Sequence, residues 1–321
     1  GYPISGHYCL VKDIGAVSPV SDFSGVFDGN GHTISDLYIN RNADDQGLFS
    51  YIVNSTIRNI AVTNVNVLGR YDVGGLAGYM EGGTITNSYI TGSVTGNEGI
   101  GGLVGFVYDG TITKSYTSGS VAGDYGVGGL LGYSAYATIT NSYVTGSVTG
   151  NESIGGLVGE DEGSSIANTY STAAVTGNED IGALVGYALH STIDNSYYDK
   201  TISGQSNLKG AIGKTTAEMK QTSLYIDSRW GSEWYFNCGN YPQLRNMPNS
   251  NITNQANNLC AILTCNSGYY NNNGVCTQCS ANSYCTGGVA APQQCPANKP
   301  TSTAGAISSS ACTCNVTSAS C

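Results

Sequence analysis

The sequence predicts an all-β protein, a single-stranded β-helix (solenoid) of about seven coils followed by a small disulfide-rich C-terminal module. Three observations predict it: a strict 27-residue repeat, a composition rich in Gly, Ser, Thr, Asn and Tyr, and a cysteine cluster near the C-terminus. We expect a β-helix at 1–248 with an N-terminal lid, strict repeats at 70–200 and a cap at 201–248. A linker at 249–258 and a cysteine-rich module at 259–321 follow.

The repeat is marked by a Gly-Gly-Leu triplet, as in Gly101-Gly102-Leu103, and by an isoleucine nine residues after the leucine, as in Ile112. A period of this length indicates a solenoid, because the unit is too short for the four strands of a propeller blade. Each unit has three apolar clusters separated by Gly, Asn and Asp. We therefore expect three strands per coil.

A serine followed by a tyrosine comes after the isoleucine in most units, and we expect the serines to face inward and the tyrosines outward. Stacked coils would then form a tyrosine stripe, a candidate surface for glycan rings or another protein. Tyrosines also favour strands without any binding role, and this alternative stays open. The stripe comprises Tyr89, Tyr116, Tyr143, Tyr170 and Tyr197.

Acidic residues recur in the turn before each Gly-Gly-Leu triplet and are weak candidates for calcium ligands. They are Glu98, Asp124, Glu152, Glu179 and Asp180. Asn and Asp are ordinary turn residues, and one carboxylate per coil is sparse for calcium. We therefore expect no cofactor and no metal, and we expect the acidic cluster at 160–162 to be a solvated turn.

The segment after the repeats is predicted to cap the last coil. Thr215 followed three residues later by Glu218 is a capping-box pattern, which predicts a short helix. Trp230, Trp234 and the aromatic residues that follow are expected to cover the end of the β-helix, which would otherwise expose unpaired strands.

Cysteine spacing predicts disulfides and an oxidising compartment, because the three histidines lie far from the cysteine cluster. The cysteines are Cys9, Cys238, Cys260, Cys265, Cys276, Cys279, Cys285, Cys295, Cys312, Cys314 and Cys321. Cys9 and Cys238 belong to opposite ends of the predicted solenoid, too far apart to bond within one chain. Cys9 is therefore expected either to bond a second chain, head to tail, or to remain a free thiol or bond a C-terminal cysteine of its own chain.

The Gly-Gly-Leu-Val-Gly units at 101–105 and 155–159 resemble the GLUG-motif repeats of bacterial surface proteins. The resemblance implies an extracellular β-helix without implying one activity. Some members of that family lie in immunoglobulin-A peptidases whose zinc site is outside the repeats, and His-Glu-x-x-His does not occur here. The tail, through Cys265-Asn-Ser-Gly-Tyr-Tyr and Cys276-Thr-Gln-Cys279, is similar to growth-factor-receptor-like cysteine-rich repeats.

Charge and repetition limit the function classes. A net charge of −10 argues against nucleic-acid binding, and no apolar run is long enough to span a membrane. Near-identical coils with a single lysine, Lys114, between residues 71 and 191 argue against an enzyme. The sequence predicts an extracellular structural protein that self-assembles into a filament or surface layer through coil ends and disulfides. The alternatives are a cell-surface adhesin for glycan or host protein, and a polysaccharide-active enzyme.

Overall fold

The computed structural model describes residues 5–15, 17–205, 210–228, 230–257, 267–272, 275–286, 292–297, 299 and 301–313. The chain divides into two compact units. The first contains residues 1–219, 227–235 and 243–256, and the second contains 220–226, 236–242 and 257–321. Residues 249–256, predicted as a linker, therefore belong to the first unit.

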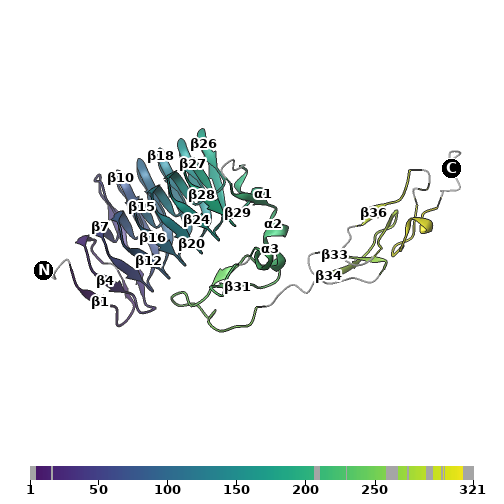
Figure 1. The fold of residues 1–321 in the computed structure, drawn as a ribbon, viewed down its shortest axis with the longest axis horizontal. Coiled ribbons are helices and arrows are strands. Elements are labelled where there is room, and N and C mark those ends of the chain that lie inside the picture. The colour runs from purple at the N-terminus through teal and green to yellow at the C-terminus, as the bar shows by residue number, and fades with distance from the viewer. Residues whose placement is uncertain are drawn as a thin grey trace. The chain divides into compact units, whose positions relative to one another are not determined.

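The first unit is a parallel β-helix with four strands in each regular coil (Figure 1). One coil runs through β10 (Tyr71–Gly74), β11 (Ala77–Glu81), β12 (Thr84–Thr86) and β13 (Tyr89–Thr95). The all-β solenoid of about seven coils is confirmed, but the prediction of three strands per coil is wrong. The Gly-Gly bend, as at Gly74-Gly75, divides one glycine-rich stretch into two strands that face different directions.

Four sheets result, which we name A to D. Sheet A contains β1 (His7–Cys9), β4 (Val26–Asp28), β8 (Thr56–Arg58), β12, β16 (Thr111–Thr113), β20 (Thr138–Thr140), β24 (Ser165–Ala167) and β28 (Thr192–Asp194). Sheet B contains β2 (Ile14–Gly15), β5 (Thr33–Ser35), β6 (Tyr38–Asn40), β9 (Ala61–Leu68), β13, β17 (Tyr116–Ala122), β21 (Tyr143–Thr149), β25 (Tyr170–Thr176), β29 (Tyr197–Asp199) and β30 (Ile212–Lys214). Sheet C contains β3 (Val20–Phe23), β7 (Phe49–Val53), β11, β15 (Val104–Tyr108), β19 (Leu131–Ala135), β23 (Val158–Glu162) and β27 (Val185–Leu189). Sheet D contains β10, β14 (Glu98–Gly101), β18 (Tyr125–Gly128), β22 (Glu152–Gly155) and β26 (Glu179–Gly182).

Coils stack in a register of one repeat, so Ile85 pairs with Ile112 and Ile112 with Ile139 in the buried core. The inward direction of the serines is confirmed, because Ser88, Ser115 and Ser142 are fully buried. Each satisfies its hydroxyl locally. The Ser88 Oγ, for example, donates to the carbonyl oxygen of Thr86 at 2.8 Å, as buried polar groups require.

Two short helices follow the last coil: α1 (Lys200–Ser203) and α2 (Thr216–Met219). The predicted capping box is present, since the Glu218 carboxylate accepts from the Thr215 backbone N–H at 2.7 Å and the Glu218 N–H donates to the Thr215 hydroxyl at 3.3 Å. Helix α1 packs against β25 and β29. Among the described residues, no helix is long and apolar enough to cross a membrane.

The aromatic segment that follows the helices was predicted to cover the end of the last coil, but it lies elsewhere. We call residues 230–235 and 243–249 the return segment. They run back along the flank of the β-helix through a hairpin of β31 (Trp234–Tyr235) and β32 (Gln243–Leu244). The Trp230 indole donates to the Asn195 carbonyl at 3.1 Å, whereas Asn246 and Asn249 bond to Asn87 and Thr33 in much earlier coils. The stacked tyrosines of this flank provide rings against which Trp230 and Trp234 pack.

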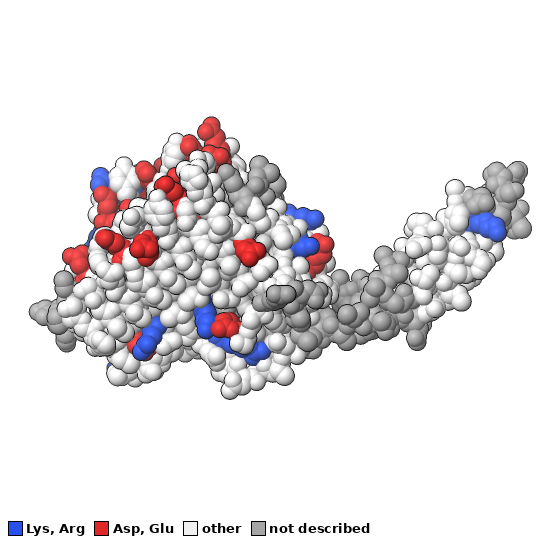
Figure 2. Space-filling view, in the orientation of Figure 1, with Lys and Arg blue, Asp and Glu red and all other residues white. Residues whose placement is uncertain are grey.

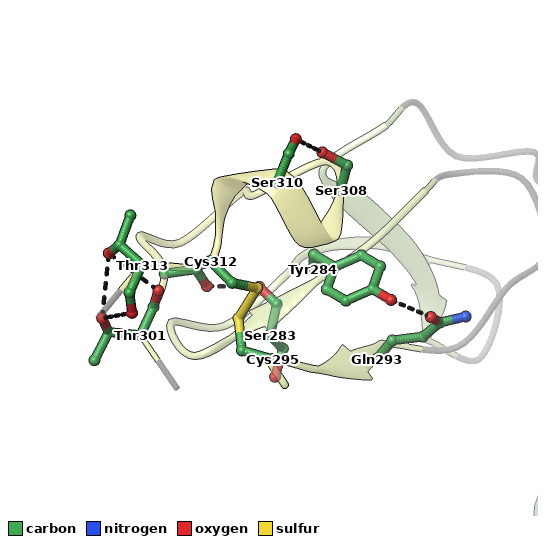
Figure 3. Close-up of a disulfide and its surroundings, with 10 residues drawn as sticks. Ser283, Tyr284, Gln293, Cys295, Thr301, Ser308, Ser310, Cys312 and Thr313 are labelled. Atoms are coloured by element: carbon green, nitrogen blue, oxygen red, sulfur yellow. Dashed lines mark hydrogen bonds between the residues drawn. A yellow bond between two sulfur atoms is a disulfide. The ribbon is translucent and has the colours of Figure 1, made fainter. Parts of the chain in front are cut away.

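The second unit contains α3 (Thr222–Asp227, of which 222–226 belong to it), β33 (Tyr269–Asn272), β34 (Val275–Gln278), β35 (Ser283–Tyr284), β36 (Gln293–Gln294) and a 3-10 turn at Ser309–Ala311. Two disulfides, Cys279–Cys285 and Cys295–Cys312, hold its C-terminal part. Figure 3 shows the second of these, with the nearby Tyr284 hydroxyl donating to the Gln293 side chain at 2.6 Å. So small a module needs such crosslinks because it buries little apolar surface.

Candidate functional site

The predicted tyrosine stripe forms on sheet B, but the return segment covers much of it. The Tyr116 and Tyr143 rings stack at 4.6 Å, and Tyr143 and Tyr170 stack at 4.9 Å. The rings leave the coil outward as expected, yet Tyr170 is only 1% exposed and Tyr197 only 3%. Trp230 and Trp234 pack against Tyr170. The expectation of a continuous exposed stripe is therefore wrong at its C-terminal half, because the chain's own tryptophans occupy that surface.

A second aromatic stripe lies on the outer face of sheet C and was missed in the sequence. Tyr51 and Tyr79 stack at 4.8 Å, Tyr79 meets Phe106 edge to face at 5.0 Å, and Phe106 meets Tyr133 at 6.0 Å. All four rings are partly exposed. The available signal was the residue directly after the last glycine of each Gly-Gly-Leu-x-Gly unit, which is aromatic in several coils.

Beside this stripe lies a surface groove, here called the acidic-aromatic groove, between the outer faces of sheets C and D. It is lined by Glu98, Phe106, Tyr133, Ser134, Ala135, Glu160 and Glu162. The Tyr133 ring lies against the backbone of Gly126, where an added Cβ would come within 2.1 Å of the ring. Glycine at this rung therefore lets the ring lie flat in the groove. The Tyr133 hydroxyl donates to the Glu98 carboxylate at 3.1 Å.

Negative charge concentrates on this side of the β-helix. Figure 2 shows Asp and Glu side chains gathered along the side of the β-helix on which β18 and β26 are labelled in Figure 1. Burial and the carboxylates of Glu152, Glu98 and Asp180 raise the pKa of Glu160. A hydrogen bond to Glu81 is the main cause that raises the pKa of Tyr51 to about 12. Glu160 in the groove thus has neighbours of the same charge, whose repulsion a bound cation relieves.

Asp72, on β10 next to the groove, is the carboxyl most strongly affected. Burial, followed by the nearby Asp45, Glu98 and Asp44 carboxylates, raises its pKa to about 7. Because the folded state holds this proton more tightly than the unfolded chain, Asp72 stabilises the fold most below about pH 4, and that contribution is lost as the pH rises through about 7.

We expect Asp72→Asn to raise the free energy of unfolding by at least about 1 kcal/mol at about pH 8 and to change it little at about pH 4. Asn tolerates the positive backbone φ of 51° at this position. Urea unfolding followed by circular dichroism at both pH values is the measurement. An equal effect at the two pH values would contradict an ionisation origin.

The proposed calcium candidates lie on one side of the β-helix without forming a recognisable cation cage. Glu98 pairs in register with Tyr125, Tyr125 with Glu152, and Glu152 with Glu179. Asp124 and Asp180 are exposed beside them. Within the described residues, no group of three or more His, Cys, Asp or Glu side chains is placed to hold a metal ion.

The acidic cluster at 160–162 is not the solvated turn that was predicted, since it forms the end of strand β23. Asp161 points into the core, is 0% exposed, and accepts a hydrogen bond from Ser134 in the preceding coil. Strand alternation explains the error, because Glu160 and Glu162 face outward while the residue between them must face inward. The second Asp161 oxygen has no hydrogen-bond partner among the described residues.

Cys9 lies on β1 as an exposed free thiol. Cys238 is disulfide-bonded, as are Cys279, Cys285, Cys295 and Cys312. The side chains of Cys260, Cys265, Cys276, Cys314 and Cys321 lie outside the described residues. The predicted disulfides of the tail are thus confirmed for two pairs, whereas the intermolecular bond of Cys9 stays a prediction.

Residues 69–95 and 123–149 of this β-helix match the GLUG motif. A segment of 77 residues, 23% of this chain, is 46% identical to Halomucin of Haloquadratum walsbyi, and the match spans about 1% of Halomucin's length. The chain also resembles the crystal structure of a candidate immunoglobulin A1 protease from Bacteroides ovatus. That likeness has a TM-score of 0.58 and 20% identity, covering 75% of this chain and 86% of the other. At this identity it shows the fold alone.

Proposed function

We propose that this chain is a non-enzymatic structural protein of an extracellular surface, and that it self-associates through the ends of its β-helix. Its GLUG repeats and the segment it shares with Halomucin support a surface protein. The tail disulfides fit an oxidising compartment. A catalytic role has less support, because a carboxylate repeated on successive coils makes no single distinctive site.

The observation that carries self-association is the open edges of the sheets. Among the described residues, sheet C begins at β3 and sheet A ends at β28, and each of these two strands pairs on one side only. A parallel sheet edge presents free N–H and C=O groups that another chain can pair with. Stacking the first coil of one copy on the last coil of the next would continue these sheets in the same parallel sense, head to tail.

The N-terminal end adds apolar surface to these edges. A hollow there is lined by Leu10, Ile14, Val17, Ser18, Val20, Phe27, Ile34, Leu48 and Phe49, and Val11 and Val20 are exposed. Burial of such side chains against a second copy stabilises association. The free thiol of Cys9 lies on β1 at this same end, where it can form a disulfide that locks the contact.

Native protein is therefore expected to give covalent species larger than one chain on a non-reducing gel, and regular fibres by electron microscopy. Reduction and Cys9→Ser are expected to remove the covalent species, whereas Ser24→Ala, an exposed position near the same end, is the matched control. A ladder of species supports the head-to-tail order. A covalent product that stops at two chains indicates a Cys9–Cys9 bond between N-terminal ends and overturns that order. A single chain in every lane, without fibres, overturns self-association.

A further inference from the structure

The acidic-aromatic groove combines two recognition elements, aromatic rings and carboxylates. Its aromatic side is the stripe through Tyr79, Phe106 and Tyr133, and its carboxylates are Glu98, Glu160 and Glu162. Aromatic rings and carboxylates both attract organic cations, the ring through its electron-rich face and the carboxylate through charge. The groove therefore has the chemistry of a cation site rather than that of an anion or a purely apolar ligand.

The chain contains its own example of this recognition at the start of sheet D. Arg70 donates two hydrogen bonds to the Asp44 carboxylate, both at 2.7 Å. The same guanidinium lies over the Tyr71 ring, 4.8 Å from its centroid. A guanidinium held between a carboxylate and a tyrosine is the bidentate and stacked geometry that arginine favours.

Later coils again carry carboxylates and a tyrosine ring at this side of the β-helix, but they carry no arginine at the position of Arg70. One and two repeats after Arg70 the chain has Asn97 and Asp124, while Tyr125 and Glu152 supply the aromatic and acidic groups of sheet D. Between residues 71 and 191, all of which the structure describes, Lys114 is the only lysine or arginine. Lys114 is paired with Glu233 of the return segment at 3.0 Å, so its charge is not directed to the groove.

The spacing between coils indicates that the ligand is an extended chain. Successive coils lie about 4.8 Å apart, and the aromatic and acidic groups recur on several of them along the axis. A single amine would use one rung only, whereas an extended chain that carries several cations would use several rungs at once. Simultaneous contacts of this kind raise affinity through effective concentration.

We propose that the acidic-aromatic groove binds an extended basic polypeptide segment whose arginine and lysine side chains lie between its carboxylates and aromatic rings. The ligand runs along the β-helix axis, and Glu98 and Glu160 supply the charge while Phe106 and Tyr133 supply ring contacts. The cations take the place that Arg70 holds beside Asp44 and Tyr71. Burial and then the neighbouring carboxylates raise the pKa of Glu160, and cations that bind beside it relieve the repulsion between these carboxylates.

A labelled oligoarginine peptide, titrated with the full chain and followed by fluorescence anisotropy, tests the proposal. We expect saturable binding that weakens as salt is added, because the contacts are largely ionic. Glu98→Gln combined with Glu160→Gln is expected to weaken binding about tenfold or more. The matched control is Asp36→Asn combined with Asp194→Asn, which removes the same charge from the residue after β5 and from the end of β28, both outside the groove. This control is expected to leave the affinity within about twofold.

Phe106→Leu tests the aromatic contribution while preserving charge. We expect binding several-fold weaker with an unchanged response to salt. If both double variants lost the same affinity for oligoarginine, the peptide would be attracted by net charge alone, and the groove would not be the binding site. Binding of an oligomeric amino sugar without binding of oligoarginine would overturn the polypeptide ligand. The Glu98, Glu160 and Phe106 variants leave Cys9 and the coil ends intact, so failure of groove binding is separate from failure of self-association.

Discussion

Trp234→Ala is expected to lower the free energy of unfolding of the β-helix unit by about 3–5 kcal/mol. Trp234 is 0% exposed, and its ring packs between Tyr143, Tyr170 and Trp230. Its indole N–H donates to the Asn141 side chain at 3.0 Å. Truncation thus leaves a large cavity and an amide oxygen without its donor, and both effects destabilise the folded state.

Urea unfolding followed by circular dichroism measures this effect. Trp230, 4.5 Å from Trp234 between ring centroids, provides a second readout, because its fluorescence shifts to longer wavelength when the return segment leaves the flank. Tyr38→Ala is the control, since Tyr38 is 64% exposed and its loss is expected to change stability by less than about 0.5 kcal/mol. If Trp234→Ala lowered the free energy of unfolding by less than about 1 kcal/mol, the return segment would contribute little to the stability of the β-helix.

The second large effect is expected from Gly155→Ala, at the bend between sheets D and C. An added Cβ would lie 1.8 Å from the Val158 carbonyl oxygen and 2.7 Å from the Gly186 nitrogen. Both neighbours are backbone atoms, one in the same coil and one in the next, and cannot rotate away as a side chain can. We expect a loss of more than about 3 kcal/mol, or failure to form the native β-helix.

The control for this variant is Gly231→Ala. The nearest atom to an added Cβ there is the end of the Glu233 side chain at 3.4 Å, an ordinary contact. Stability is expected to stay within about 0.5 kcal/mol or to rise, because alanine restricts the unfolded chain. Thermal melting of both variants, compared with the unsubstituted chain, measures these changes in stability. A Gly155→Ala melt that matched the unsubstituted chain would show that the bend can open to admit a side chain.

Periodicity made the solenoid predictable. Residues one repeat apart, such as Ile112 and Ile139, stack because a parallel β-helix places equivalent residues on adjacent rungs. The inward serines and the capping box at Thr215 also followed from local patterns. The fourth strand per coil did not, because a glycine pair can be read either as part of a strand or as a sharp bend until the backbone is placed.

The candidate site was less predictable. The acidic-aromatic groove was missed because Tyr133 and Glu98 are 35 residues apart and meet only when one coil lies on the next. Asp161 was misread for a related reason, since three successive acidic residues suggest a turn, and only the strand's alternation shows that the middle one is buried.

The sequence by itself determined the repeat length, the class of fold, the buried isoleucines and the disulfide character of the tail. These depend on period and composition, which are properties of neighbouring residues. Only the tertiary structure decided which aromatic stripe is covered and which remains accessible. Residues such as Trp234 and Asn141 are 93 positions apart, and the choice of flank depends on apolar surface that exists only after the coils have stacked.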